Sequence, residues 1–412
     1  MSTLSATPGE EVQARRNVGG LSHSIEFGLL LSCCRAERHP ESMQEFLTQE
    51  ASRIEDWERV FELAGYHGVL PALHSALCNG SQSKSMDLRV GVGAELERRA
   101  SYLAKKNLRL SAELIRILDC LDAAGVAAIP HKGPALAETI YGDLALRDFS
   151  DLDVLVRPAD IPRAKQALAR IAYRPNISLR PAEERAYIAS GYEYTFDGSA
   201  GKNLLELQWN FVPRFFAIDF DLSAVFARAG SGTVAGRVVR TLAPEDLFLS
   251  LCVHAAKHLW SRLCWLRDIA AVMERVLLDW ERVFAEARRL GIHRIVRVNL
   301  RLAHVLLGAR FPEKTNAISA ASTHDEQVQT ITEAMAQHIA KTEDYSTQSF
   351  DHLRWMLRLR ERSIDRYRYV SRLLITPSLG EWEWVKLPEP LFGCYRGVRL
   401  MRVGTRLFGM RR

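Results

Sequence analysis

Two aspartates stand two residues apart in an otherwise apolar stretch, residues 150–156, which reads Ser-Asp-Leu-Asp-Val-Leu-Val. Residues two apart on a β-strand point to the same face, so a strand here would present Asp151 and Asp153 together and direct its aliphatic side chains into a core. Two adjacent carboxylates repel one another, and a divalent cation relieves that repulsion. Hard oxygen ligands suit Mg²⁺, which also carries the phosphates of substrates. The pair therefore predicts nucleotide chemistry.

A basic turn lies upstream of the acidic pair. Residues 126–129 have the pattern of a short buried strand, Lys132-Gly133 that of a turn, and residues 134–141 that of a helix with proline in its first turn. Glycine lets the backbone approach an anion, and a helix N-terminus offers unpaired N–H groups. With the positive charge of Lys132, this segment is predicted to hold a triphosphate opposite the acidic strand.

A third acid lies on a predicted hairpin. Residues 192–196 and 203–209 have strand patterns, and residues 197–201 between them are rich in turn formers. Alternation along the second strand places Leu204, Glu206 and Gln208 on one face. A single glutamate between leucines calls for a functional reason.

These residues resemble the polymerase-β-like nucleotidyltransferase superfamily and, within it, a bacterial group of nucleotidyltransferase family proteins. The resemblance extends over roughly residues 25–375. Its flanks are Asp56-Trp57 with residues 67–71 on one side and residues 254–268 on the other. Its central motifs are Lys132-Gly133, Tyr141, Arg147, Asp151-Leu152-Asp153 and Glu206.

The resemblance implies an α+β fold, with a small mixed β-sheet core between N-terminal and C-terminal helical regions. It also implies that an acceptor hydroxyl attacks the α-phosphate of a nucleoside triphosphate such as ATP, and that pyrophosphate leaves. Two Mg²⁺ ions about 3.5–4 Å apart, or Mn²⁺ in their place, would stabilise the attacking and leaving oxygens. The implied metal ligands and catalytic residues are Asp151, Asp153 and Glu206, with Glu206 also accepting the hydroxyl proton. The implied nucleotide-binding residues are Lys132, Gly133, Arg147, Tyr141, Lys257 and His258.

Two positions depart from the family pattern. The wider superfamily has Gly-Ser and a shorter gap before its acidic pair, where this chain has Lys132-Gly133 and a longer gap. The closer group has a histidine two residues after the third acid, where this chain has Gln208. These departures make a nucleotide-binding interaction protein without turnover one alternative function. A polynucleotide-acting nucleotidyltransferase is another.

Several of these residues also have simpler interpretations. An isolated Asp-X-Asp is found at solvated strand edges and in glycosyltransferases that bind nucleotide sugars, and Tyr141 could be a packing residue. Arg147 could form a surface ion pair with its neighbour Asp148. His254 and His258 would share one helix face and could bind a transition metal, although a zinc-protease motif requires a glutamate where Ala255 stands. Packing among the nearby tryptophans is the favoured interpretation of this histidine pair.

Length and composition predict a cytoplasmic enzyme. A chain of 412 residues with 47% hydrophobic residues can form two or three domains with sizeable cores. The seven cysteines are odd in number and lack zinc-ribbon spacing, so reduced thiols are expected. No signal-peptide pattern and no apolar run long enough for a membrane span is evident. The predicted divisions are a flexible N-terminus 1–22, a helical region 23–100 with a linker at 79–85, a catalytic core 101–215, a helical domain 216–350 and a basic tail 351–412.

The tail carries the excess positive charge. From residue 353 onward there are 13 Arg and one Lys against five acids, a net charge of +9 within a chain whose total is +6. Residues 353–374 alternate arginines with aromatic residues, which predicts a single basic amphipathic helix. Such a helix suits an anionic membrane surface, nucleic acid or an acidic partner. Binding to a membrane would place the protein at the inner membrane face. A solvated helix whose arginine stems pack on the enzyme body is the alternative.

Overall fold

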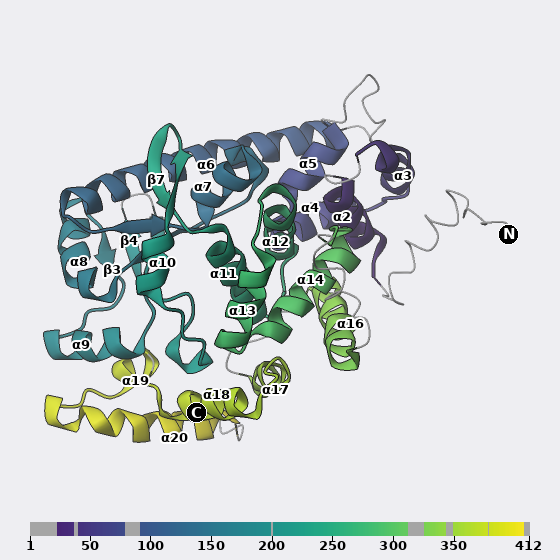
Figure 1. Ribbon diagram of the computed structural model, residues 1–412. Coiled ribbons are helices and arrows are strands. Elements are labelled where there is room, and N and C mark those ends of the chain that lie inside the picture. The colour runs from purple at the N-terminus through teal and green to yellow at the C-terminus, as the bar shows by residue number, and fades with distance from the viewer. Residues whose placement is uncertain are drawn as a thin grey trace. The chain divides into compact units, whose positions relative to one another are not determined.

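The computed structural model describes residues 23–36, 40–78, 91–198, 201–311, 325–342, 349–377 and 379–407. It has the predicted α+β fold, in which helical regions precede and follow a mixed sheet along the chain (Figure 1). The chain divides into two compact units, each built from three stretches of sequence. The predicted flexible N-terminus 1–22 and the predicted linker 79–85 lie outside the described residues. No helix within the described ranges is both long and apolar enough to cross a bilayer.

The first unit, Met1–Glu97 with Trp260–Ala270 and Arg297–Asp344, is helical in its described part. Its helix α4 shows how local sequence fixes element ends: the Asp56 side chain accepts a hydrogen bond from the Arg59 backbone N–H at the start, and Gly68 ends the helix at φ +64°. The Arg35 guanidinium joins distant stretches by donating to the carbonyl oxygens of Val305 and Leu306. The helices that lie wholly in this unit are α2 (Ile25–Ala36), α3 (Pro40–Ser52), α4 (Trp57–His67), α5 (Leu70–Cys78) and α16 (Glu326–Lys341).

The second unit, Arg98–Leu259 with Ala271–Val296 and Tyr345–Arg412, contains both sheets. The main sheet has the order β1-β2-β5-β4-β3, and only the β2–β5 pair is parallel. The parallel pair therefore lies inside the sheet, with neighbours on both sides. The predicted hairpin is present as β4 and β5. The strands are β1 (Ala128–Pro130), β2 (Leu152–Val156), β3 (Arg174–Pro175), β4 (Glu193–Gly198) and β5 (Gly201–Gln208), and the separate hairpin is β6 (Gly230–Val234) with β7 (Arg237–Thr241).

Two amphipathic helices share one hydrophobic core with the main sheet. The long helix α6 (Val92–Ala123) contributes buried residues at helical spacing such as Leu110, Leu114 and Ile117. The helix ends where the Val126 N–H donates a hydrogen bond to the Leu121 carbonyl and Gly125 adopts φ +67°. Helix α8 (Ile161–Arg170) covers the same core, and every residue of β2 is buried. The acidic strand is thereby fixed in a rigid layer.

The segment before β2 differs in detail from the prediction. The strand predicted at 126–129 is β1 at Ala128–Pro130, where an edge position tolerates proline. The predicted helix 134–141 forms as α7 (Gly133–Leu136) followed by a π-helical turn, η1 (Ala137–Tyr141). The Thr139 hydroxyl donates to the Ala135 carbonyl within this turn, a local bond of the kind that competes with the regular helical ladder.

The prediction of a single basic helix over residues 353–374 was wrong. The tail contains α17 (Phe350–Arg358) and α18 (Ser363–Ile375), separated by residues 359–362. Arg294 donates to the carbonyl oxygens of Arg358 at 2.7 Å and Arg360 at 3.4 Å, so a tertiary contact caps the first helix. The buried Arg360 side chain donates to the Phe216 carbonyl at 2.7 Å. The break thus follows from contacts with distant residues.

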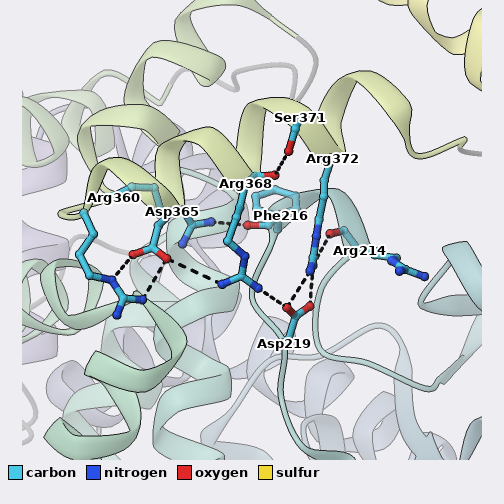
Figure 2. A network of polar contacts seen from close by, with 9 residues as sticks. Arg214, Phe216, Asp219, Arg360, Asp365, Arg368, Ser371 and Arg372 are labelled. Atoms are coloured by element: carbon cyan, nitrogen blue, oxygen red, sulfur yellow. Dashed lines mark hydrogen bonds and ion pairs between the residues drawn. The ribbon is translucent and has the colours of Figure 1, made fainter.

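The tail arginines make ion pairs and hydrogen bonds within this unit. Figure 2 shows Asp219 between Arg368 and Arg372, with two Arg372 nitrogens at 2.6 and 2.9 Å from its carboxylate oxygens. Burial tends to raise the Asp219 pKa, but the hydrogen bonds from Arg372 and the charges of both arginines hold it below its ordinary value.

The remaining helices of the second unit are α9 (Pro181–Ser190), α10 (Leu222–Arg228), α11 (Pro244–Lys257), α13 (Trp280–Leu290), α19 (Leu379–Trp384) and α20 (Tyr395–Leu407). Two further helices, α12 (Leu263–Arg275) and α14 (His293–Leu307), each have residues in both units.

Candidate active site

The parallel strand pair brings two of the predicted catalytic acids together. Asp153 on β2 is the direct register partner of Glu206 on β5. Residues opposite one another on neighbouring strands have side chains on the same face, so the two carboxylates share one side of the sheet. Asp153 is only 2% exposed, while Glu206 is half-buried. Both therefore stand on rigid central strands rather than on loops.

Lys132 and Gln208 connect these carboxylates. The Lys132 ammonium lies 2.7 Å from Asp153 Oδ1, and Gln208 Nε2 donates at 2.9 Å both to Asp153 Oδ1 and to Glu206 Oε2. The backbone N–H of His131 donates to the Asp153 carbonyl, which holds the basic turn against the acidic strand. The structure thus joins the two sequence features that were predicted to form one site.

Gly133 allows the basic turn to pass close to the strand. It has φ +52°, a conformation that side chains other than glycine rarely adopt, and a Cβ there would stand 3.2 Å from the Asp151 carbonyl oxygen. Asp151 itself immediately precedes β2 and is half-buried. The glycine is required by both conformation and space.

Burial and mutual repulsion govern the ionisation of the acids. Desolvation, followed by the neighbouring charge of Asp153, raises the pKa of Asp151 and raises that of Glu206 to about 8. Desolvation also acts on Asp153, but the charges of Lys132 and His131 outweigh it and lower the Asp153 pKa. One carboxylate of the cluster is thus firmly ionised, and Glu206 binds a proton far more readily than an ordinary glutamate.

A fourth acid, which the sequence analysis did not predict as a site residue, extends the cluster. Glu193 on β4 is the register partner of Gln208, and Thr195, two residues on, is the partner of Glu206. Burial raises the Glu193 pKa, the Lys257 charge opposes that shift, and the Glu193 charge in turn raises the pKa of Glu206. The alternation of the predicted hairpin places Glu193 on this face, but only the exact register shows its proximity.

Lys257, predicted to bind nucleotide, lies beside this fourth acid. Its Nζ donates to the Tyr192 hydroxyl at 3.2 Å and lies 5.0 Å from the centre of that ring. Burial lowers the Lys257 pKa, although Glu193 acts in the opposite direction. His352 of the tail bonds through Nε2 to the Lys257 carbonyl at 2.9 Å. The second unit therefore holds two lysines and four acids in one neighbourhood.

The remaining predicted residues differ in their placement. Arg147 is buried, and its charge partly opposes the rise in the Asp151 pKa that burial causes, so it belongs to the cluster. Its neighbour Asp148 pairs with Lys106 at 2.6 Å. Tyr141 is buried, and the Arg275 guanidinium lies 5.4 Å from its ring centre, which is the arrangement of a packing residue. His258 follows the end of α11, with its ring 5.0 Å from that of His254.

The carboxylates of Asp151, Asp153 and Glu206 would suit a hard divalent cation if the Lys132 ammonium moved away from Asp153. Within the described part of the chain, Asp151, Asp153 and Glu206 do not belong to a set of three ligand side chains whose donor atoms all lie within 4.8 Å of one another. Lys132 and Gln208 both contact Asp153 Oδ1, an oxygen that a metal would use. All donors are carboxylate oxygens, and two of them have raised pKa values that a nearby cation would lower.

A comparison with protein families identifies the family of the chain. A family model described as an uncharacterised nucleotidyltransferase matches residues 54–308. The chain belongs to this family. The matched segment contains every predicted site residue, and it makes the protein a nucleotidyltransferase with a nucleotide substrate. Searches of the curated proteins and of the solved structures give no significant match to this nucleotidyltransferase.

Proposed function

We propose that this nucleotidyltransferase moves a nucleoside monophosphate from a nucleoside triphosphate to a hydroxyl acceptor, in a metal-dependent reaction of the EC 2.7.7 class. The observation that supports the proposal most directly is the pairing of Asp153 with Glu206 on parallel strands, with Lys132 2.7 Å from Asp153. Carboxylates fixed on rigid strands beside a lysine ammonium group are what a phosphate-binding metal site needs.

In the proposed reaction the acceptor oxygen forms a bond to the α-phosphorus while the bond to the bridging oxygen of the pyrophosphate breaks. The acceptor proton passes to Glu206, which could accept it once a bound cation had lowered its raised pKa and ionised the carboxyl group. Lys132, once released from Asp153, and Arg147 neutralise charge on the triphosphate, and Lys257 stands beside them. Pyrophosphate is the leaving group.

Asp151, Asp153 and Glu206 would hold Mg²⁺, or Mn²⁺ in its place. The chemistry that the ion supplies when bound is neutralisation of negative charge on the phosphate oxygens. On this proposal Lys132 serves as the counter-ion of Asp153 when no metal is bound and moves to the substrate phosphates when one is. Gln208, hydrogen-bonded to both carboxylates, keeps their spacing fixed.

A second candidate is a nucleotide-binding interaction protein without turnover. Its support is the same ion pair, because Lys132 and Gln208 both contact Asp153 Oδ1 without requiring a metal. A site that is stable in this form could bind a nucleotide through its lysines and never assemble the metal. The two candidates differ in one measurable property, the transfer of label.

The test is incubation of the full-length protein with each α-³²P-labelled nucleoside triphosphate, Mg²⁺ or Mn²⁺, and a cell extract. The wild type should label an acceptor, and Asp153→Asn and Glu206→Gln should each reduce labelling by at least about 10²-fold. Asp119→Asn is the matched control, because Asp119 is a well exposed acid of the same unit that pairs only at the surface with Arg237. It should label like the wild type.

Nucleotide binding measured by equilibrium dialysis separates the outcomes. Binding without labelling under any of these conditions supports the interaction protein. A wild type that neither binds nor transfers nucleotide, or an Asp153→Asn variant that transfers normally, contradicts the proposed reaction.

A further inference from the structure

A second group of potential metal ligands lies in the first unit. His74 and Cys78 are four residues apart on α5, so their side chains share one helix face, and Glu97 comes from the second turn of α6. Within the ranges that the structure describes, these three form the one set of His, Cys, Asp and Glu side chains whose ligand atoms all lie within 4.8 Å of one another. None of them takes part in the carboxylate cluster of the second unit.

The histidine is oriented into this group. His74 Nε2 lies 3.1 Å from Glu97 Oε1, but the contact does not have the geometry of a hydrogen bond, and the nitrogen is buried without a hydrogen-bond partner. Burying a ring nitrogen without a hydrogen-bond partner lowers the free energy of unfolding, and a bound cation would remove that penalty. The Glu97 side chain is well exposed and His74 largely buried, so the group has one closed and one open side.

The ligand types select the metal. A ring nitrogen, a thiol sulfur and a carboxylate oxygen together suit Zn²⁺, whereas Mg²⁺ and Ca²⁺ prefer oxygen alone. Tetrahedral ligands about 2.0–2.3 Å from Zn²⁺ lie about 3.3–3.8 Å apart, so small side-chain rotations would close this group around an ion. Three protein ligands leave a fourth position on the open side for water or another ligand.

We propose that His74, Cys78 and Glu97 bind one Zn²⁺ ion, which ties α5 to the start of α6 in the first unit. The ion would close the chain between residues 78 and 97 and stabilise the two helix ends that meet there. It would be distinct from the proposed catalytic metal in both location and ligand chemistry. The alternative is an ordinary histidine–glutamate contact beside an uninvolved thiol.

Cobalt substitution in the full-length protein tests the cysteine directly. Co²⁺ added to reduced, metal-free protein should give a thiolate-to-cobalt charge-transfer absorption that saturates at one equivalent and is displaced by Zn²⁺. Cys78→Ser should abolish the band, and His74→Ala and Glu97→Gln should each weaken Zn²⁺ binding at least about tenfold. Cys394→Ser, which removes an exposed cysteine of the second unit, is the matched control and should retain the band. Asp153→Asn should retain it as well.

Alkylation of the wild type provides a test that does not depend on the folding of any variant. Zn²⁺ should protect Cys78 from iodoacetamide, as read by mass spectrometry of the peptides, and should leave the exposed Cys394 equally reactive. A charge-transfer band that survives in Cys78→Ser, or Cys78 labelling that is the same with and without Zn²⁺, overturns the proposal.

Discussion

At the scale of single residues, burial and repulsion set the properties of the carboxylate cluster. The raised pKa of Glu206 means that the folded, metal-free protein holds a proton there across a pH range in which the unfolded chain has already lost it. Because the folded state binds more protons in that range, its stability relative to the unfolded state falls as pH rises from about 4.5 to about 8. Above pH 8 the loss is complete.

The Glu206→Gln substitution should therefore stabilise the metal-free protein at alkaline pH. We expect little difference from the wild type near pH 4 and a gain on the order of 1–3 kcal/mol at pH 8.5, because the amide cannot ionise. The amide oxygen can still accept the hydrogen bond from Gln208, so packing is preserved. Chemical denaturation in the presence of a chelator across this pH range measures the gain. A gain that is the same at every pH would refute the assigned ionisation.

The sequence was informative about these residues to different degrees. The spacing of Asp151 and Asp153 and the alternation around Glu206 predicted acids on one face, and the structure places Asp153 and Glu206 side by side. Their catalytic role stays a prediction. Glu193 could not be assigned from the sequence, since its proximity depends on the register of a hairpin whose turn length does not fix it.

At the scale of elements, the turn between β1 and α7 is constrained by its glycine, Gly133. Gly133→Ala would place a methyl group 3.2 Å from the Asp151 carbonyl in a backbone conformation that alanine disfavours. We expect a loss of about 1–3 kcal/mol in the free energy of unfolding. Gly125→Ala is a useful control, since its φ is +67° but no atom lies within 4 Å of the added methyl group. Thermal denaturation of both variants separates the effect of backbone strain from that of the close contact with the Asp151 carbonyl. Equal losses of stability in the two variants would show that the close contact is unimportant.

The tail helices should depend on one buried arginine rather than on the visible surface ion pairs. Arg360 is 1% exposed and satisfies the Phe216 carbonyl, so Arg360→Ala would leave a cavity and an unpaired buried carbonyl, at a cost of about 2–5 kcal/mol. Arg372→Ala would remove one of two arginines from the half-exposed Asp219, at a cost of about 1 kcal/mol or less. Denaturant titration distinguishes the two, and a larger loss for Arg372→Ala would contradict this ranking.

The hairpin of β4 and β5 could be predicted to within a few residues, because strand patterns flank a run of turn formers. The break between α17 and α18 could not be predicted, because Arg294, which donates a hydrogen bond to the Arg358 carbonyl at the end of α17, is more than sixty residues away in sequence. Residues 353–374 contain no proline or glycine, the residues that usually mark a helix break in a sequence.

At the scale of the whole molecule, both units are assembled from separated stretches of chain. The predicted domain bounds were drawn as consecutive segments, and they stay a prediction. The basic tail is part of the second unit, where many of its arginines contact protein groups. The exposed basic side chains of the tail that remain for an anionic membrane or an acidic partner include Arg354, Arg358, Lys386 and Arg396. Binding to either surface stays a prediction as well.

Removal of the tail should therefore damage the enzyme itself. A chain ending at residue 349 loses the bonds of His352 to Lys257 and of Arg360 to Phe216, together with buried aromatic residues such as Tyr369. We expect the midpoint of thermal unfolding to fall by more than about 10 °C, since several kcal/mol of packing are lost. A chain ending at residue 407 keeps all of these contacts and should unfold like the full chain; equal behaviour of the two truncations would exclude a structural role for the tail.

The bond between His352 and the Lys257 backbone has a genetic consequence. A nonsense mutation in any codon from 350 to 352 would leave every acid of the cluster translated, yet it would remove the residue that bonds to the helix end carrying Lys257. Such alleles should behave as complete knockouts in a complementation assay, and C-terminal fusions should be tolerated only where the reading frame is kept through about codon 407.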